Sequence, residues 1–318
     1  MKICIISFDS TYFDHNIKLE LERRSIDVNH IDASKFKFKY KSVFDRININ
    51  LNNKEYKKNK KREALEEYIL KKITAIGKQE IILFIRPDKI SRVTHLEIKK
   101  QTKTYISYIY DSCKRFPIDH LLNGVFDEIF SFDLVDSKKY NFTFIPNYIY
   151  MEKRESDLSK LNNNIFMVIS IDERFNFLNK LANYLSSQNI SYKFIAVGKK
   201  LPEKTNKNIV FSKRTLLPCD LKDDLEHSKI FLDLIRKDHN GLSFRIFEAI
   251  AMQRKIITTN KTIKNYDFYN PNNILILDSD TDINISNDFL ATPYEPLSEA
   301  IYCKYTIQNW VNTVFKIN

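Results

Sequence analysis

Short runs of β-branched and aromatic residues alternate with helix-forming segments along this chain, and no other feature constrains the fold as strongly. The pattern is typical of α/β proteins with parallel sheets and argues against all-α and all-β folds. Strands in the first half are predicted at Lys2–Phe8, Asp27–Asp32, Ile81–Ile85, Tyr105–Asp111 and Glu128–Asp133. Helices are predicted at His15–Arg24 and Lys60–Ile76, and residues 40–60 fit a helix or a long surface excursion.

The pattern restarts in the second half, after the apolar segment Phe144–Tyr150 gives way to the charged segment Met151–Asp157. A chain of 318 residues also has room for two domains. We therefore expect two Rossmann-like domains, residues 1–150 and 151–318, facing across a cleft. Predicted strands of the second domain are Ile165–Ser170, Tyr192–Val197, Ile209–Phe211, Ile230–Leu234, Lys255–Thr259 and Ile274–Leu277. Its predicted helices are Phe175–Ser187, Pro218–Ser228, Leu242–Met252 and a terminal Pro296–Phe315.

The composition excludes several classes of protein to which this chain could belong. Four glycines in 318 residues exclude a collagen-like chain and a full Gly-x-Gly-x-x-Gly fingerprint. No apolar run is long enough to span a bilayer, and the apolar start of the chain has the length of a strand and lacks a signal-peptide cleavage site. We expect a cytoplasmic protein with reduced thiols, because its four cysteines lie far apart.

The net charge of +11 is placed unevenly. Residues 1–150 contain 28 Lys and Arg against 20 Asp and Glu, and the densest basic run is Lys54–Arg62. Two interpretations of this charge carry equal weight. The lysines form a solvated helix face, or they attract the protein weakly to an anionic membrane surface, at the inner face of the cytoplasmic membrane. Nucleic acid is not expected as a partner, because no zinc finger, helix-turn-helix or RRM signature accompanies the charge.

The segment Leu232–Met252 contains the most informative pattern. An apolar strand leads into a polar loop, then Gly241, then an amphipathic helix, so free backbone N–H groups and the helix dipole form an anion site near Gly241 and Ser243. Arg245 adds a charge for phosphates, and Glu248 can accept hydrogen bonds from both hydroxyls of a ribose. The alternative is an ordinary capped helix whose Arg245 and Glu248 form a surface pair.

The same segment resembles the donor-binding motif of GT-B glycosyltransferases, which are built from two Rossmann-like domains. Many retaining members have two glutamates eight positions apart; here Glu248 matches the second, and Asn240 stands at the first. The stretches Tyr110–Ser112, Phe126–Asp133 and Asn260–Pro271 resemble bacterial lipopolysaccharide and capsule glycosyltransferases and CgeB-like proteins. This resemblance implies a nucleotide-sugar donor, with UDP-sugar favoured, held by His239, Asn240, Gly241, Leu242, Ser243, Arg245 and Glu248. It also implies that the terminal helix packs back on the first domain.

Further candidates follow other predicted strands. Asp9, Asp88 and Asp111 each lie at a strand end of the first domain, where a carboxylate can orient or deprotonate an acceptor hydroxyl. Asp111 is the preferred base, and each of the three has a helix cap as its alternative. His15 is a candidate acid or base, with a structural role as its alternative. Arg174 and Lys180 are candidates for the diphosphate, with a solvated helix start as the alternative.

No metal site and no cofactor are expected. The run Asp278–Asp282 contains Asp-x-Asp, but we interpret it as a solvated loop. The predicted function is sugar transfer from a nucleotide-sugar to a hydroxyl of a glycan or lipid-linked glycan acceptor. The second domain would bind the donor and the first the acceptor. The alternatives are a nucleotide-sugar epimerase of the same fold and a non-catalytic polyanion-binding or scaffold protein.

Overall fold

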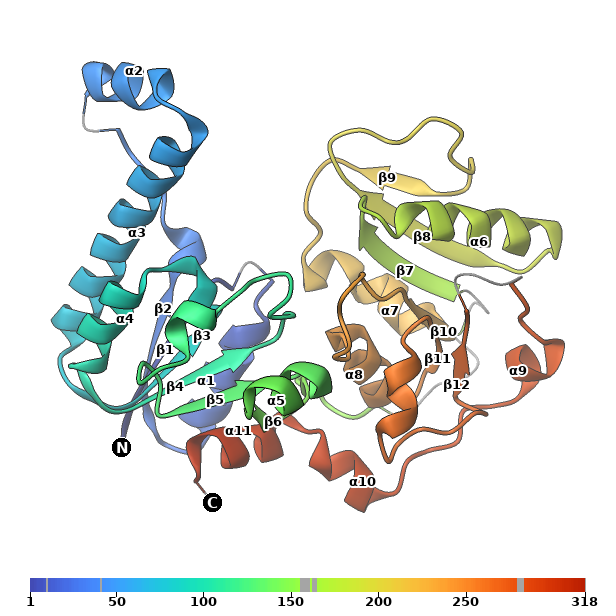
Figure 1. The fold of residues 1–318 in the computed structure, drawn as a ribbon. Coiled ribbons are helices and arrows are strands. Elements are labelled where there is room, and N and C mark those ends of the chain that lie inside the picture. Colours follow the sequence, from blue (N-terminus) through green and yellow to red (C-terminus); the bar gives the residue numbers. More distant parts are fainter. Residues whose placement is uncertain (10, 41, 155–160, 162–164, 279–282, 318) are drawn as a thin grey trace. The chain divides into compact units, whose positions relative to one another are not determined.

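A computed structural model describes residues 1–318 except 10, 41, 155–160, 162–164, 279–282 and 318. The chain divides into two compact units, unit 1 at Met1–Ile145 with Val311–Asn318, and unit 2 at Pro146–Trp310. Each contains its own parallel sheet of six strands, so the prediction of two Rossmann-like α/β sheets is confirmed (Figure 1).

Unit 1 has the strand order β2-β1-β3-β4-β5-β6, and every neighbouring pair is parallel. The strands are β1 Lys2–Ser7, β2 Asp27–Asp32, β3 Gln79–Ile85, β4 Thr102–Ile109, β5 Glu128–Ser131 and β6 Thr143–Phe144. The helices are α1 Phe13–Arg23, α2 Val43–Leu51, α3 Lys54–Ile76, α4 Arg92–Lys99 and α5 Leu134–Tyr140. Short 3₁₀ turns occur at Ala33–Lys35, Pro87–Lys89 and Asp119–Leu121. Residues 3–7 of β1 are all buried, as the expected first strand requires.

Unit 2 has the order β12-β11-β10-β7-β8-β9, again all parallel. The strands are β7 Ile165–Ser170, β8 Tyr192–Val197, β9 Val210–Ser212, β10 Ile230–Asp233, β11 Lys255–Thr258 and β12 Ile274–Ile276. The helices are α6 Phe175–Ser187, α7 Lys222–His227, α8 Phe244–Ala251, α9 Asn287–Ala291 and α10 Glu299–Lys304. The last helix, α11 Ile307–Phe315, begins in unit 2 and ends in unit 1. Short 3₁₀ turns lie at Pro218–Leu221 and Lys261–Asn265.

Helix α3 begins six residues earlier than the predicted Lys60. Asn53 caps it, accepting a hydrogen bond from the Tyr56 N–H at 2.8 Å. Such a cap satisfies one of the donors that every helix start leaves open, so the basic run Lys54–Arg62 becomes helical. The helix ends at Gly77, whose φ of 72° is the left-handed conformation that glycine adopts most easily.

The predicted single terminal helix Pro296–Phe315 is wrong. It is two helices, α10 and α11, and the first starts at Glu299 after the N-cap Ser298. The break lies at Tyr305 and Thr306, where backbone N–H of Ile149 donates to Tyr305 O at 2.7 Å and Ile307 N–H donates to Ile149 O at 2.9 Å. A neighbouring strand-like segment thus takes the hydrogen bonds that a continuous helix would use.

Two smaller predictions are also corrected. The apolar segment Phe144–Tyr150, whose composition is strand-like, contains only the last residue of β6 Thr143–Phe144 and one isolated bridge at Ile149. The predicted helix Pro218–Ser228 divides into a 3₁₀ turn and the short α7.

The end of the terminal helix packs within unit 1, as predicted, because Val311–Asn318 belongs to that unit. The side chain of Asn312 accepts a hydrogen bond from Arg24 at the end of α1. Lys316 forms an ion pair with Glu128 of β5 at 2.7 Å.

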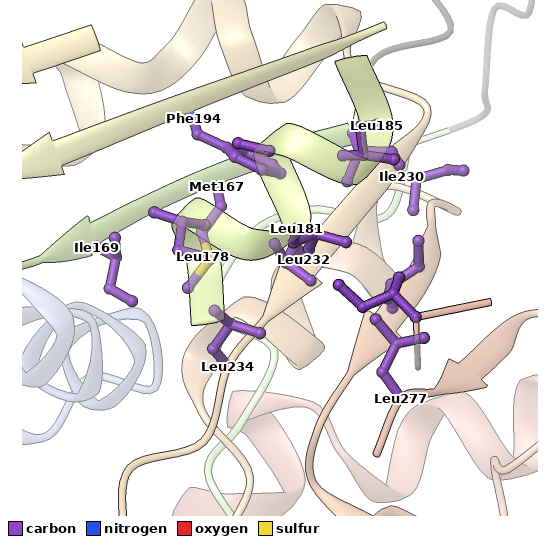
Figure 2. Packing of buried hydrophobic residues seen from close by; sticks show 14 of the residues in the cluster. Met167, Ile169, Leu178, Leu181, Leu185, Phe194, Ile230, Leu232, Leu234 and Leu277 are labelled. Atoms are coloured by element: carbon purple, nitrogen blue, oxygen red, sulfur yellow. The ribbon is translucent and has the colours of Figure 1, made fainter. Parts of the chain in front are cut away.

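The core of unit 2 lies between its sheet and α6. Leu178, Leu181 and Leu185 recur on one face of α6 and pack on Met167, Phe194 and Leu232 of the strands (Figure 2). Their spacing of three and four residues is that of a helix face turned toward a core.

Leu181→Ala tests this core. Leu181 is fully buried, so the substitution should lower the free energy of unfolding by about 2–5 kcal/mol through lost apolar contact and the cavity left behind. The exposed Asn176 on the same helix provides the control, because Asn176→Ala should change the free energy of unfolding by no more than about 0.5 kcal/mol. Urea unfolding followed by circular dichroism measures both, and equal midpoints would contradict the assignment of this face.

Candidate functional site

The strand order of unit 2 reverses between β7 and β10, because the chain proceeds from β7 outward in one direction to β8 and β9 and in the other to β10, β11 and β12. In open α/β sheets, ligands bind beyond the carboxyl ends of the strands at such a switch point. The residues that follow β7 and β10 are therefore the first place to look for a site. They include Asp172, Arg174, Arg236 and the loop 234–243 that leads to α8.

The loop 234–243 is held in place by side chains of the following segment. Thr259 Oγ1 accepts from the Ile235 N–H at 2.9 Å, Thr262 Oγ1 donates to Asn240 O at 2.6 Å, and Asn260 Nδ2 donates to Gly241 O at 3.1 Å. Asn147 Nδ2 donates to Leu242 O at 2.8 Å. These bonds engage the Ile235 N–H and the carbonyl oxygens of residues 240–242, and they fix the path of the loop into the helix.

Asp233, buried at the end of β10, fixes the start of α8. It accepts hydrogen bonds from Ser243 Oγ at 2.7 Å and from Thr258 Oγ1 at 2.8 Å. Ser243 is the N-cap residue of α8, but its hydroxyl serves Asp233 and makes no cap hydrogen bond to the helix. The helix start therefore keeps its open donors.

Backbone N–H groups at this helix start point to an anion site. Among the described residues, no acceptor is recorded for the N–H groups of Gly241, Leu242 and Ser243. Three consecutive amide donors at the positive end of a helix favour a phosphate or carboxylate group. The helix itself begins at Phe244, two residues later than predicted.

Arg245 and Glu248 form a pair, as the alternative interpretation expected, but the pair is buried. Arg245 Nη1 lies 2.7 Å from Glu248 Oε2, and the Arg245 guanidinium lies over the rings of Phe166 and Phe231. The angle of approach makes the contact an ion pair without a hydrogen bond, since neither atom has a hydrogen-bond partner among the described residues. A surface pair is therefore excluded.

Glu248 has a second partner that sequence reasoning missed. Its Oε1 accepts a hydrogen bond from the hydroxyl of Tyr150. Burial, followed by the charge of Glu248, raises the pKa of Tyr150, so this hydroxyl stays protonated and donates. A carboxylate accepts about four hydrogen bonds in all, so Glu248 keeps capacity for a ligand hydroxyl. Its role toward a ribose stays a prediction.

Arg174 and Arg236 meet at Asp172 beside the switch point. Arg174 donates to both carboxylate oxygens of Asp172, at 2.8 and 2.6 Å, and to Leu234 O at 3.0 Å. Arg236 Nε lies 3.3 Å from Asp172. Burial acts to raise the pKa of Asp172, but the hydrogen bonds and charges of the arginines outweigh it and lower that pKa. Two guanidinium groups thus contact one carboxylate here.

The remaining predicted residues of unit 2 are less tightly placed. His239 and Asn240 lie half-buried in the loop, and the His239 N–H donates to Arg236 O at 3.2 Å. Lys180 is exposed on α6, and no described contact brings it to Arg174 or to α8. Its role toward a diphosphate stays a prediction.

The sheet of unit 1 has its own switch point, between β1 and β3. Asp9 follows β1 and accepts a hydrogen bond from the His15 N–H at 2.8 Å, as a carboxylate at a helix start does. The loops that flank this switch point each contain a residue with left-handed backbone, Tyr12 and Arg86, both with φ of 65°. Left-handed conformations of such residues cluster at binding and active sites.

A buried group beside Asp9 was not predicted. Asp14 on α1 is almost fully buried, and its Oδ2 has no hydrogen-bond partner among the described residues. Burial, reinforced by Asp9, raises the pKa of Asp14 well above its ordinary value, and burial also raises the pKa of Tyr110. The sequence gives no signal that Asp14 is buried, because a polar residue of an amphipathic helix is predicted to face solvent.

The other two predicted carboxylates of unit 1 share one arginine. Arg86 donates to both oxygens of Asp88, at 2.8 and 2.9 Å, and lies 3.7 Å from Asp111. Its guanidinium is 3.9 Å above the ring of Phe116. Asp111 is thus close to Asp88, while no described contact joins either of them to Asp9 or His15. The catalytic roles of Asp9, His15 and Asp111 stay predictions.

Metal binding finds no support in the described part of the chain, where no group of three or more His, Cys, Asp or Glu side chains could hold an ion. Residues 279–282 of the Asp-x-Asp run lie outside the described residues, and Asp278 pairs with Lys261 at 2.6 Å. None of the helices described has the length and apolar character that crossing a bilayer requires.

Comparisons with known proteins identify the fold of the chain. No protein-family model matches the chain, and no curated protein matches its sequence. Solved structures do match. A UDP-forming α,α-trehalose-phosphate synthase from Burkholderia xenovorans is 9% identical with a TM-score of 0.59, covering 99% of this chain and 98% of that one. The N-terminal domain of Candida albicans trehalose-6-phosphate phosphatase is 11% identical with a TM-score of 0.56, over 99% and 96%.

The chain has the GT-B fold. A UDP-GlcNAc 2-epimerase from Methanocaldococcus jannaschii, in complex with UDP-GlcNAc and UDP, also matches, at 11% identity and a TM-score of 0.50 over 99% of this chain and all of that one. At these identities the likeness concerns the fold alone. The predicted fold class is therefore confirmed, and the chemistry must be argued from the residues.

His30 supplies a pH-dependent test of the unit 1 site. Its Nε2 lies 2.8 Å from Ser7 Oγ, and burial lowers its pKa from 6.5 to about 4. Between these values the unfolded chain binds the proton and the folded chain does not, so lowering the pH destabilises the fold. Relative to His30→Gln, the parent should lose about 1–3 kcal/mol of unfolding free energy as the pH falls from 6.5 to 4.

Urea titrations at a series of pH values measure this difference. His120→Gln, which replaces an exposed histidine of the same unit, should follow the parent. Parallel pH profiles for the parent and His30→Gln would show that His30 titrates alike in both states and would contradict the assignment.

Proposed function

We propose that this protein transfers a sugar from a nucleotide-sugar donor to a hydroxyl group of an acceptor glycan, with unit 2 binding the donor and unit 1 the acceptor. The observation that supports donor binding most directly is the helix start at the switch point of unit 2. There, the N–H groups of Gly241, Leu242 and Ser243 have no hydrogen-bond acceptor among the described residues, and Arg174 and Arg236 lie at the same switch point. A nucleoside diphosphate matches such a site in charge and in its many acceptor oxygens.

The roles in the donor site follow from the contacts. The diphosphate would accept hydrogen bonds from the amides of residues 241–243, and Arg174 and Arg236 would balance its charge. Glu248, whose Oε2 is buried without a hydrogen-bond donor, would accept from the ribose. Arg245 would hold Glu248 in place through their ion pair and would not itself meet the phosphates. This revises our expectation for Arg245.

The donor is proposed to be a UDP-sugar, which agrees with the UDP-forming synthase and the UDP-bound epimerase among the matching folds. The acceptor is proposed to be a bacterial surface glycan, such as lipopolysaccharide or capsule, on the resemblance carried by Tyr110–Ser112, Phe126–Asp133 and Asn260–Pro271. In unit 1, Asp9 and Asp111 lie beyond the strand ends where an acceptor hydroxyl would be oriented, and the reaction is proposed to occur in the cytoplasm.

Transfer can be distinguished from epimerisation by incubating the protein with UDP-sugars alone and with acceptor glycans. A transferase releases UDP only when an acceptor is present, apart from slow hydrolysis. An epimerase converts the donor with no acceptor, and the match to the UDP-GlcNAc 2-epimerase makes that the second candidate. Chromatography of the nucleotide-sugars separates the two, and no binding of any nucleotide-sugar would favour the scaffold alternative.

Ser243→Pro tests the amide donors directly. Ser243 has φ of −71°, which proline adopts without strain, so the substitution removes the N–H while keeping the backbone path. Ser243→Ala is the matched control, since it keeps the N–H and loses only the hydroxyl contact to Asp233. A charge-assisted hydrogen bond is worth about 1.5–3 kcal/mol, so UDP should bind about ten- to a hundredfold more weakly to Ser243→Pro than to Ser243→Ala.

Calorimetric titration of UDP into both variants measures this ratio, with circular dichroism to confirm folding. Equal affinities of the two folded variants would remove the Ser243 amide from the donor site.

Glu248→Gln tests the ribose contact through a double-mutant cycle. The amide keeps an oxygen for Tyr150 but loses charge as an acceptor, so UDP should bind about tenfold more weakly. The parent should also bind 2′-deoxy-UDP more weakly than UDP, and Glu248→Gln should show a smaller difference, because the two changes remove one interaction.

Glu226→Gln is the control, since Glu226 also pairs with an arginine, Arg154, at 2.5 Å but lies away from α8 in the sequence. Strict additivity of the Glu248 and 2′-hydroxyl effects would show that this carboxylate does not hold the ribose.

A further inference from the structure

Helix α2 presents an apolar face that nothing in the described structure covers. Four of its side chains are largely exposed: Val43 by 72%, Phe44 by 83%, Ile47 by 50% and Leu51 by 82%. Ile49 of the same helix is only 3% exposed. Large apolar residues exposed singly are ordinary, but four on one short helix form a contiguous surface of the kind that meets a partner.

The geometry of a helix explains this division. At about 100° per residue, the four exposed side chains fall within an arc of about 100°, and Ile49 lies on the opposite side. Helix α2 contacts α3, and Figure 1 shows it at the end of α3 that is remote from the sheet. Ile49 therefore attaches α2 to its own unit, and the face with Phe44 and Leu51 is turned outward.

The segment around this face contains most of the chain's net positive charge. Residues 35–62 include eleven Lys and Arg against two Asp and Glu, a net of +9 in a protein of net +11. On both sides of α2 these cations are exposed, with Lys37 and Lys39 before the helix and Lys54, Lys58 and Lys61 after it.

Aromatic residues separate the lysines that precede α2. Phe36, Phe38 and Tyr40 alternate with Lys35, Lys37 and Lys39 and are partly exposed. The Phe38 and Tyr40 rings pack edge to face, with centroids 5.1 Å apart. Aromatic rings with one wet and one apolar side, next to lysines, are typical of the boundary between lipid headgroups and acyl chains.

We propose that residues 35–62, the α2 segment, attach the protein to an anionic membrane surface. The apolar face of α2 enters the boundary between headgroups and acyl chains, and the flanking lysines contact the anionic headgroups. The inference goes beyond the proposed sugar transfer and does not depend on it, since vesicle binding is measured without donor or acceptor.

Charge decides between a membrane and a second copy of the chain. A symmetric dimer through α2 would bring two segments of net +9 together, and like charges across an interface oppose association. A nucleic acid would satisfy the lysines but would leave the apolar face uncovered. An anionic bilayer satisfies both, because it offers negative headgroups above an apolar layer.

The test is flotation of the full chain with vesicles of phosphatidylcholine alone and of phosphatidylcholine mixed equally with phosphatidylglycerol. The parent should float with the anionic vesicles only, and less as salt is added. Phe44→Ser with Leu51→Ser should weaken this binding by about tenfold or more. Val93→Ser with Val135→Ser, which changes two exposed valines elsewhere in unit 1, should leave it unchanged.

Two double variants that remove lysine charges test the role of the lysines separately. Lys58→Gln with Lys61→Gln should reduce binding to anionic vesicles by roughly fivefold for each charge, whereas Lys103→Gln with Lys222→Gln should have little effect. Equal flotation with neutral and anionic vesicles, or full binding by the Phe44 and Leu51 variant, would overturn the proposal. A change in oligomeric state or a loss of thermal stability in that variant would also overturn it, because the face would then pack against protein.

Discussion

The hydrogen bonds of Asp233 determine what the second unit can do. This carboxylate is buried at the end of β10 and would be costly without partners. Its two donors come from different elements, Ser243 at the start of α8 and Thr258 at the end of β11. By binding both, Asp233 joins a strand, its neighbour and the following helix at one point of the sheet edge. It also occupies the Ser243 hydroxyl, the group that would otherwise cap the helix, so the first turn of α8 receives no side-chain cap from Ser243.

The two units have different side chains at the same location of the fold. Each sheet reverses its strand order, and in each the loops that flank the reversal contain ionisable side chains. In unit 2 these are the arginines 174 and 236 with one shared carboxylate, a surrounding that favours an anion. In unit 1 they are Asp9 and the buried Asp14, a surrounding in which a proton can be held or a hydroxyl oriented. This difference agrees with the proposed sugar transfer, in which the donor is a polyanion and the acceptor a hydroxyl.

Much of the fold could be predicted from the sequence because several strands, such as β1, β3 and β7, are nearly continuous apolar runs. Ile165–Ser170, Phe175–Ser187 and Tyr192–Val197 have the predicted boundaries. The failures occur where distant residues intervene, which no local pattern records. Ile149 interrupts the terminal helix by pairing with Thr306, and Tyr150 reaches Glu248 from far along the chain. The candidate site at Gly241–Glu248 was predicted because an element boundary and charged residues coincide there. Asp14 was missed because its burial depends on packing.

The path of the chain has a consequence for the order in which the protein is completed during synthesis. Unit 1 is discontinuous, because it takes its last residues, Val311–Asn318, from the end of the chain. Unit 2 is therefore an insertion within unit 1, and the Ile149–Thr306 bridge pairs residues near its two ends. On a ribosome, all of unit 2 emerges before Asn312 can reach Arg24 or Lys316 can reach Glu128. The second unit can close on itself first, and by bringing its ends together it shortens the effective loop that the final step must close.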